Sequence, residues 1–383
     1  MKVVICSNTA WYLWKFRLTL ARALQAAGHE VVAAAPRDGH AAKLEAAGIR
    51  FVELPMDNAG MNPLRDLWLL VRMRALLRRE RPGAFLGYTI KPNVYGGLTC
   101  RGLGISSIHN VSGLGTAFAR EGALAWIAGG LYRIGLGRAR RVFFQNAEDR
   151  AEALRRGLVA EAITEVLPGS GVDLERFAPV ERAAPGAGEP VRFLLLARLI
   201  RDKGVGEYVD AARRLRAAGV AATCRLLGFL DVKNRAAIPR ETVDQWVREG
   251  VVDYLGEADD VRPVIAEADC VVLPSFYREG TPRSLLEAAS MGRPVITTDA
   301  PGCRDVVDDG VSGFLCRVRD AADLAEKMRR MAEMTPEARA AMGRAGRAKM
   351  EREYDERLVI GRYLDEIAKL AAEEIAMGNG EVL

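Results

Sequence analysis

Short apolar runs alternate with longer stretches of helical spacing along most of the chain. In the first half the short runs are rich in β-branched residues, which predicts buried strands. The expected strands are residues 3–7, 29–35, 49–54, 84–88, 106–111 and 141–145. The first expected helix ends near residue 28, and further helices are expected at residues 43–47, 63–81, 93–103, 124–135 and 148–156. This order predicts a domain in which helices cover a parallel sheet.

The same pattern starts again after residues 178–190, a stretch whose Pro and Gly residues predict a linker. Further strands are expected at residues 191–197, 224–227, 252–255, 270–273 and 295–298, followed by a helical region over 336–377. The sequence therefore predicts an α/β protein of two Rossmann-like domains, which cover residues 1–177 and 191–359.

Composition places the chain among globular proteins, since 49% of its 383 residues are apolar and 27% are charged. The six cysteines are scattered, with no C-x-x-C pair, which is typical of small core residues in a reducing compartment. Only three histidines occur, none at ligand spacing to a cysteine, so no metal is expected. Met1-Lys2 leads directly into a strand, and no apolar run approaches the roughly 18–20 residues that span a bilayer. We therefore expect a cytoplasmic protein without a membrane span.

Charge is distributed unevenly along the chain. Residues 1–176 contain 24 Lys and Arg against 15 Asp and Glu, a net charge of +9, whereas the remainder has a net charge of −4. This asymmetry indicates that the two domains meet different partners. Anionic lipid is one candidate for the basic half. Nucleic acid is another, but no base-stacking motif or basic tail supports it, so no nucleic-acid partner is expected.

The loop between the strand 270–273 and the next helix carries the first candidate chemistry. Thr281 and Pro282 are expected to be the N-cap and the first position of that helix. Backbone N–H groups at such a helix start favour a phosphate. Glu279 and Glu287, with seven residues between them, are suited to accept hydrogen bonds from sugar or ribose hydroxyls. Phosphate, ribose and a second polyol together indicate a nucleotide sugar.

The motif E-G-T-P-R-S-L-L-E resembles the E-x7-E motif of the family 4 retaining glycosyltransferases, which have the GT-B fold. The resemblance covers nearly the whole chain. It implies two Rossmann-like domains that face each other across a cleft, with a C-terminal helix of about residues 360–377 that packs back on the N-terminal domain. It also implies that Glu279 orients the donor sugar and that Glu287 holds the ribose. The other donor-binding residues of this motif would be Gly280, Thr281, Pro282, Arg283, Ser284 and Leu285. The alternative is that the two glutamates are solvated residues around a helix start.

A second anion site is predicted after the strand 191–197, where A-R-L-I-R-D-K-G places Arg198 and Lys203 in a strand-to-helix loop. Two cations there can neutralise a diphosphate. In the resembled family this R-x4-K pattern holds the donor diphosphate and stabilises the leaving nucleotide, so no metal or other cofactor is required. Gly228 is a further expected donor-binding residue. A solvated loop with two basic residues is the alternative.

The N-terminal domain is expected to hold the acceptor. The segments Y-T-I-K-P-N-V-Y-G and I-H-N-V-S-G-L-G-T-A-F resemble a bacterial subgroup that extends sugars on a polyprenyl diphosphate, including N-acetylgalactosaminyltransferases of protein N-glycosylation. The resemblance implies that Lys91 meets the acceptor diphosphate, with Asn8, Arg17 and Asn110 nearby. His109 is expected at a strand end that faces the cleft, as a catalytic residue or equally as a hydrogen-bonded core histidine.

Two segments, residues 67–81 and 124–141, combine Leu and aromatic residues with clustered Arg. Such segments suit a lipid interface, but helices that pack on a sheet look similar. We expect the first to be mainly core and the second to contact a membrane. The resulting hypothesis is a UDP-sugar-dependent transferase that acts on a lipid-linked saccharide at the inner face of the cytoplasmic membrane. A soluble family 4 transferase with a small sugar acceptor and a GT-B UDP-sugar epimerase are the alternatives.

Overall fold

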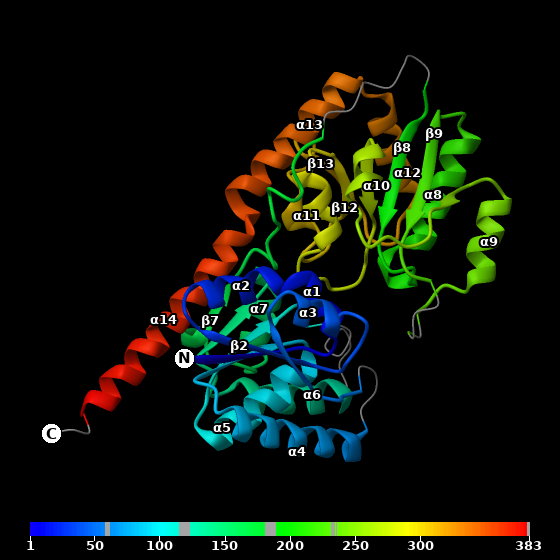
Figure 1. The fold of residues 1–383 in the computed structure, drawn as a ribbon. Coiled ribbons are helices and arrows are strands. Elements are labelled where there is room, and N and C mark those ends of the chain that lie inside the picture. Colours follow the sequence, from blue (N-terminus) through cyan, green and yellow to red (C-terminus); the bar gives the residue numbers. More distant parts are fainter. Residues whose placement is uncertain (58–61, 115–122, 181–188, 231–233, 235, 381–383) are drawn as a thin grey trace. The chain divides into compact units, whose positions relative to one another are not determined.

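The structure of the chain is a computed structural model, and it is described for residues 1–57, 62–114, 123–180, 189–230, 234 and 236–380. It divides into two compact units. The first comprises Met1–Ser170 together with Arg357–Leu383, and the second comprises Gly171–Glu356. Each unit contains a parallel sheet with helices on both faces, so the expected pair of Rossmann-like units is confirmed (Figure 1). Most of the expected linker lies outside the described residues.

The first unit is built on a seven-stranded parallel sheet of order β3-β2-β1-β4-β5-β6-β7. All of the expected strands occur. β7, a three-residue edge strand, was not expected. The strands are β1 (Lys2–Cys6), β2 (Glu30–Ala35), β3 (Arg50–Glu53), β4 (Ala84–Tyr88), β5 (Ser106–Val111), β6 (Arg141–Phe144) and β7 (Thr164–Val166).

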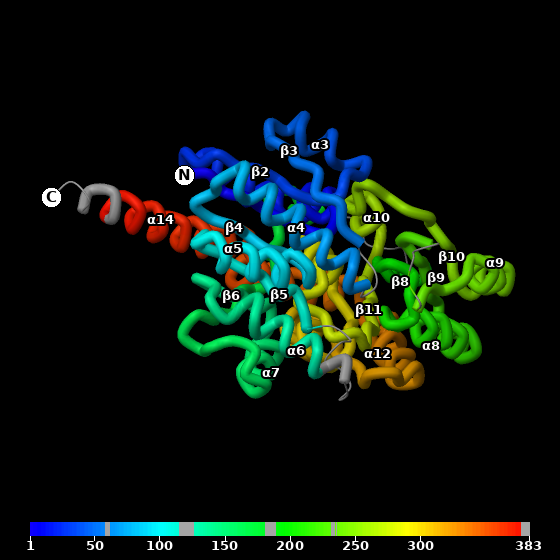
Figure 2. Tube along the Cα trace, turned by 90° about the horizontal axis from the view of Figure 1, so that it is seen from below, coloured from blue at the N-terminus to red at the C-terminus, as the bar shows by residue number. Residues whose placement is uncertain are grey.

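Side chains alternate between the two faces of this sheet. On β1, Val3 and Ile5 pack with one group of helices, whereas Val4 and Cys6 pack with the other. The first group is α1 (Ala10–Phe16), α2 (Leu18–Ala26), α3 (Ala41–Ala46) and α14 (Glu356–Gly380). The second is α4 (Pro63–Glu80), η1 (Pro92–Gly96), α5 (Gly97–Leu103), α6 (Ala123–Leu136) and α7 (Ala147–Arg155). Figure 2, seen from below, shows α4, α5 and α6 lying over the strands as one layer.

The expected C-terminal helix is confirmed, but the helical region from residue 336 is not continuous. α13 (Pro336–Lys349) passes into a π-helical turn at Met350–Tyr354, and α14 starts only at Glu356. The extended residue Asp355 interrupts the helix. Beyond the break, Val359, Tyr363, Ile367 and Leu370 pack into the core of the first unit. The last helix of the chain therefore belongs to the first unit.

The second unit contains a six-stranded parallel sheet of order β10-β9-β8-β11-β12-β13. Its strands are β8 (Val191–Leu196), β9 (Ala222–Leu227), β10 (Asp253–Tyr254), β11 (Cys270–Leu273), β12 (Val295–Thr298) and the unexpected β13 (Gly313–Cys316). One face packs on α8 (Val205–Ala217), α9 (Arg240–Arg248) and α12 (Ala321–Glu333). The other packs on α10 (Arg262–Glu267), α11 (Arg283–Ser290) and residues of the π-helical turn.

No helix among the described residues is long and apolar enough to cross a membrane. Within the same residues, no group of His, Cys, Asp and Glu side chains has a geometry that could hold a metal ion. All six cysteines are buried as free thiols.

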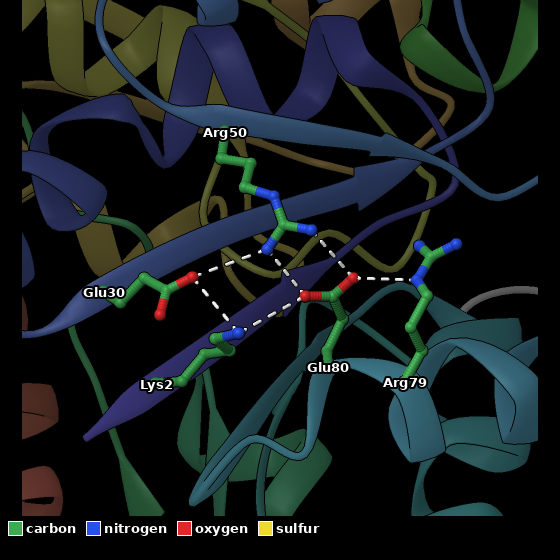
Figure 3. Close-up of polar contacts among 5 residues, drawn as sticks. All are labelled: Lys2, Glu30, Arg50, Arg79 and Glu80. Carbon is green, nitrogen blue, oxygen red and sulfur yellow. Dashed lines mark hydrogen bonds and ion pairs between the residues drawn. The ribbon is translucent and has the colours of Figure 1, made fainter.

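A cluster of charged side chains fixes the C-terminal end of α4 to the sheet (Figure 3). Glu80 is almost completely buried, and it accepts hydrogen bonds at 2.7 and 3.0 Å from both Nη atoms of Arg50 and one at 3.0 Å from Arg79 Nε. Lys2 lies between Glu80 and Glu30, at 3.5 and 3.2 Å. Burial opposes ionisation of Glu80, but the arginine hydrogen bonds outweigh it and lower the pKa of this carboxyl. α4 is thereby held against the starts of β1, β2 and β3.

We expect Glu80→Gln to destabilise the protein by about 1–3 kcal/mol, because it removes charge-assisted hydrogen bonds to a buried group. Since the pKa of Glu80 is lower in the folded state, its contribution is present above the pKa of an unfolded glutamate and is lost as the pH falls through the folded value. Urea unfolding at neutral and acidic pH measures both effects. Glu30→Gln is the matched control, because Glu30 is half-exposed in the same cluster and should change the free energy of unfolding little.

Candidate functional site

The strand order of the second unit reverses between β8 and β11. From β8 the chain goes outward to β9 and β10, and from β11 it goes in the other direction to β12 and β13. Loops that follow the two central strands diverge at such a point, and ligands of open α/β sheets bind there. Arg198 and Lys203 follow β8, and Glu279 follows β11. The structure therefore brings the two expected anion-binding segments of this unit to one place.

Close backbone packing joins these two loops. Gly204 has a φ of +73°, and a Cβ atom there would lie 2.0 Å from the carbonyl oxygen of Pro274. Next to this contact, the carbonyl of Asp202 accepts hydrogen bonds from the N–H groups of Phe276 and Tyr277, at 3.0 and 3.1 Å, and lies 3.2 Å from Ser275 Oγ. The turn at 202–204 is thus bound to the segment that leads to Glu279.

Within this frame, Lys203 Nζ forms an ion pair with Glu279 Oε1. Ser275 Oγ donates a second hydrogen bond to the same oxygen at 2.8 Å. Both charged side chains remain partly exposed. Arg198 lies in the same loop as Lys203 and is exposed, and among the described residues its side chain has no ion-pair partner. A carboxylate held between a lysine and a serine, with a further arginine close in sequence, can meet both hydroxyl and phosphate groups.

The start of α11 differs from the sequence prediction. Pro282, not Thr281, is the N-cap, and the helix begins at Arg283. Pro282 is extended, with a ψ of 117°, so helical geometry starts one residue later than expected. Proline has no side-chain acceptor, and the Pro282 cap position makes no side-chain hydrogen bond to the helix start in the residues that the structure describes. A helix start without a side-chain cap retains the character of an anion site.

Glu287 lies one helical turn after Arg283 and forms an ion pair with it at 3.2 Å. Arg283 Nη1 also donates a hydrogen bond to the carbonyl of Gly171 at 2.9 Å. Ser284 lies partly exposed beside Arg283, whereas Gly280, Thr281 and Leu285 are buried. In this structure both glutamates of the pair are thus already bound to cations.

Two glycines allow the loops of this site to approach one another. Gly228, an expected donor-site residue, has a φ of +151°, and a Cβ atom there would lie 1.8 Å from the carbonyl oxygen of Ala197. Gly302 has a φ of +77°, and its Cβ would lie 2.0 Å from the carbonyl oxygen of Gly280. Gly302, like Ser275, was missed in the sequence. Its signal was the Pro-Gly pair after β12, where only glycine fits both the backbone conformation and the close contact.

In the first unit the strand order reverses between β1 and β4. Asn8 follows β1 and is partly exposed, while Lys91 follows β4. Lys91 Nζ forms an ion pair of 2.6 Å with Asp66 of α4, and both side chains are largely buried. Lys91 is therefore fixed by a carboxylate of α4 and is not a free surface lysine.

Arg17 is buried at the end of α1, and no carboxylate of the described residues pairs with it. Its guanidinium lies 4.2 Å from the ring centroid of Tyr88, and Nη2 donates to the hydroxyl of Tyr12 at 3.0 Å. Asn110 is also fully buried, and its side chain donates to the hydroxyl of Tyr363 at 3.1 Å. These two expected acceptor residues thus belong to a polar network beneath the ends of β1, β4 and β5.

Thr89, between β4 and Lys91, was not singled out from the sequence. It has a φ of +69°, which is strained for a β-branched residue. Its hydroxyl is buried and has no hydrogen-bond partner within the described part of the chain. Strained backbone conformations of this kind gather at functional sites. The switch point of the first unit therefore includes a residue whose conformation costs stability.

His109 does not occupy the expected position at a strand end. It lies within β5 and is completely buried. Its Nδ1 lies 3.3 Å from Asn93 Oδ1, and its Nε2 lies 3.0 Å from Ser107 Oγ. Burial lowers the pKa of His109 to about 3, so the ring is neutral. The alternation of β5 directs position 109 towards the α4–α6 layer, which makes it a hydrogen-bonded core histidine.

Two family models match the chain in succession. The model described as "Glycosyl transferase 4-like domain" matches residues 14–169, and the model described as "Glycosyl transferases group 1" matches residues 190–334. The N,N'-diacetylbacillosaminyl-diphospho-undecaprenol alpha-1,3-N-acetylgalactosaminyltransferase of Campylobacter jejuni is 25% identical over 95% of this chain and 97% of that protein.

The chain is a family 4 glycosyltransferase.

Further similarities extend over both units of this family 4 glycosyltransferase. The UDP-Gal:alpha-D-GlcNAc-diphosphoundecaprenol alpha-1,3-galactosyltransferase of Escherichia coli is 23% identical over 67% of this chain and 68% of that protein. The crystal structure of Anabaena Alr3699/HepE in complex with UDP and glucose matches with a TM-score of 0.77 and 17% identity, over 96% of this chain and 99% of that chain. The enzyme has the GT-B fold and belongs to a retaining family, as the sequence motifs predicted.

The neutral state of His109 predicts a specific pH dependence. Its contribution to stability is complete above the unfolded pKa of about 6.5 and declines by about 1.4 kcal/mol per pH unit as the pH falls towards 3. The variant His109→Gln lacks this pH-dependent contribution to the free energy of unfolding. The stability gap between wild type and variant should therefore narrow between pH 7.5 and pH 5.5 in urea unfolding.

The same variant should keep most of its transferase turnover at pH 7.5, because a buried histidine contacts no substrate. A gap in stability that is equal at both pH values would contradict the neutral assignment. Loss of turnover by orders of magnitude with an unchanged unfolding midpoint would contradict the core role.

Proposed function

We propose that this glycosyltransferase moves N-acetylgalactosamine or another N-acetylhexosamine from a UDP-sugar to a hydroxyl of a polyprenyl-diphosphate-linked saccharide, with formation of an α-linkage. The observation that carries the proposal is the similarity to the Campylobacter jejuni enzyme, which spans 95% of this chain and so includes the first unit as well as the second. The similarity to the Escherichia coli galactosyltransferase, whose name also specifies an undecaprenol-linked acceptor, supports the acceptor class.

In the second unit, the UDP-sugar would replace the internal ion pairs of the site. Lys203 and Arg198 would neutralise the diphosphate together with the start of α11. Glu279, released from Lys203, would accept hydrogen bonds from the donor sugar, and Glu287 would hold the ribose. Since Ser275 also bonds to Glu279, this carboxylate keeps one fixed partner when Lys203 turns to the diphosphate.

The reaction is then a substitution at the anomeric carbon with retention. The bond between that carbon and the UDP oxygen breaks, and a bond to the acceptor oxygen forms on the same face. The acceptor proton passes to an oxygen of the departing diphosphate. Charge that develops on the leaving UDP would be stabilised by Lys203, Arg198 and the helix start, so the chain's own cations do the work that a divalent cation does in other transferases.

In the first unit, the switch point between β1 and β4 is the proposed acceptor site. Lys91 would meet the acceptor diphosphate. Its pairing with Asp66 supports a role in which the ammonium is already oriented before the ligand arrives. Asn8 is partly exposed and would contact the acceptor directly, whereas Arg17 and Asn110 would act from the buried network beneath it. Because such an acceptor is anchored in lipid, the enzyme would work at the membrane surface.

The test is a donor-release assay with the purified protein. A panel of UDP-, GDP- and ADP-sugars is offered with and without a polyprenyl-diphosphate-linked saccharide in detergent. We expect UDP release that depends on the lipid-linked acceptor, and a glycolipid product with an α-anomeric signal in NMR spectra. Release with a soluble sugar acceptor alone would favour a soluble transferase. Conversion of the UDP-sugar without transfer would favour an epimerase, and either result would overturn the proposed acceptor.

Substitutions in the donor site separate binding from chemistry. Glu279→Gln should lower turnover by about 10²-fold or more with UDP affinity nearly unchanged, because it removes a charge that acts at the sugar. Arg198→Ala should weaken UDP binding by about tenfold, because it removes a diphosphate contact. Steady-state kinetics and calorimetric UDP titration distinguish the two.

Arg201→Ala is the matched control for Arg198. Arg201 is an exposed arginine of the same loop, in the turn η4 (Arg201–Lys203), and lies outside the R-x4-K pattern. Its substitution should leave UDP affinity unchanged. Equal weakening by both substitutions would mean that the loop attracts UDP only through its general charge.

A further inference from the structure

α4 carries apolar side chains on two sides. Leu69, Met73, Leu76 and Leu77 are buried against the sheet, as expected for a core helix. The opposite side of its N-terminal half is also apolar, because Leu64, Leu67, Trp68 and Val71 are exposed, Trp68 by 63%. The expectation that segment 67–81 is mainly core therefore describes one side of the helix only. A surface stripe that contains a tryptophan and three aliphatic residues needs a partner.

α6 has the same arrangement. Tyr132 and Leu136 are buried in the core of the first unit. Trp126, near the start of the helix, is 82% exposed, and Ile127 beside it is also exposed. An exposed tryptophan near the N-terminal end thus occurs on both helices.

The topology brings these exposed residues to one edge of the sheet. α4 and α6 each precede a strand of the parallel sheet, β4 and β6, so each helix runs antiparallel to the strands and starts at their carboxyl ends. Both helices cover the same face, with α5 between them (Figure 2). Ile90, which directly follows β4 at this edge, is exposed as well. The apolar side chains therefore gather at the edge where Lys91 lies.

The charges of the two helices complement this apolar surface. The only carboxylates of α4, Asp66 and Glu80, are buried and paired with Lys91 and Arg50, and the sequence of α6 contains none. The exposed charged residues of the two helices are all arginines. They are Arg65, Arg72, Arg78 and Arg79 on α4 and Arg133 on α6. On α4 three of them follow the apolar stripe.

We propose that Leu64, Leu67, Trp68, Val71, Trp126 and Ile127 form a docking face that inserts into the headgroup region of an anionic lipid bilayer. Tryptophan and aliphatic side chains suit the boundary between headgroups and acyl chains, and arginines behind them suit anionic headgroups. This inference rests on the proposed function, because an acceptor on a polyprenyl anchor has to be reached at the bilayer. Arg65 is paired with Asp57 in the segment before α4, at 2.8 Å, but the other exposed charges of the two helices are arginines that no described carboxylate outside the helices balances in number. This excess of positive charge favours anionic lipid over a second protein of ordinary mixed surface.

The docking face is also rigidly supported. The buried carboxylate of Glu80 fixes one end of α4 to the sheet, and the Asp66–Lys91 pair fixes the other end to the loop after β4. A bilayer that holds Leu67 and Trp68 therefore lies next to the residue proposed to meet the acceptor diphosphate. The orientation of the lipid-linked substrate and the position of Lys91 are then set by the same helix.

Flotation of the full-length protein with vesicles tests the proposal. Phosphatidylcholine vesicles with and without phosphatidylglycerol are the probes, with no acceptor present. We expect binding to the anionic vesicles, weakened by salt, and a blue shift of tryptophan fluorescence. The double variant Trp68→Ser/Trp126→Ser should lose about tenfold or more of the vesicle affinity, because two interfacial anchors are removed.

Leu358→Ser/Ile375→Ser is the matched control. Both residues are exposed apolar positions on α14, which packs on the opposite face of the same sheet, and Ile375 is 64% exposed. The control should bind like wild type, and both double variants should keep the wild-type melting temperature. Equal binding by the tryptophan variant, or no vesicle binding by the wild type, would overturn the docking face. Self-association that the tryptophan variant abolishes, without vesicle binding, would assign the face to a second copy and also overturn the proposal.

Transfer to acceptor in detergent separates this proposal from the proposed function. The tryptophan variant should retain wild-type turnover there, because its substituted residues lie outside the donor and acceptor sites. Loss of turnover in detergent would assign the tryptophans to the acceptor site and overturn a purely lipid role. Vesicle binding through the docking face without any use of a lipid-linked acceptor would leave the docking face supported and refute the proposed function.

Discussion

The candidate donor site depends on the contact between Gly204 and the carbonyl of Pro274. No side chain fits at Gly204, and the tight approach allows the carbonyl of Asp202 to accept two backbone hydrogen bonds from the segment after β11. These bonds bring two loops from neighbouring strands into register, and the Lys203–Glu279 ion pair follows from that register. A substitution at Gly204 would therefore separate the residues of the site without changing any of them.

The order of strands and helices was predictable because parallel strands buried on both faces give continuous apolar runs. β7 and β13 were missed for physical reasons. In β7 only Thr164 is buried, so no apolar run marks the strand. β13 begins with Gly313, which lies directly against the carbonyl of Val295, and a glycine within a strand weakens the sequence pattern. Edge strands that depend on close backbone contact leave little trace in hydrophobicity.

The motifs brought forward the residues of the candidate donor site, but they did not predict how these residues pair with one another. The motifs identified Glu279 and Lys203 separately, and only the fold shows that they bind each other. The helix start was placed one residue too early because Thr281 is a good cap by type, whereas the extended Pro282 takes that position. For His109 the motif left a catalytic and a core position open, and the alternation of β5, which decides the face, gives the core position. Local preference failed where backbone geometry decided the outcome.

The sequence could not distinguish the exposed apolar side of α4 from its buried side. Both sides are apolar, and helical spacing does not say which of them packs on the sheet. The fold separates them, and it also joins the exposed stripe to the site through Asp66. This carboxylate lies one residue before Leu67 and holds Lys91. One short stretch of α4 thus contributes to the proposed docking face and also holds Lys91 of the proposed acceptor site. A basic N-terminal half and a mildly acidic C-terminal half would then have a common explanation: under the two proposals, the first unit would meet a charged lipid surface as well as a substrate, whereas the second would need only the few cations that hold a nucleotide.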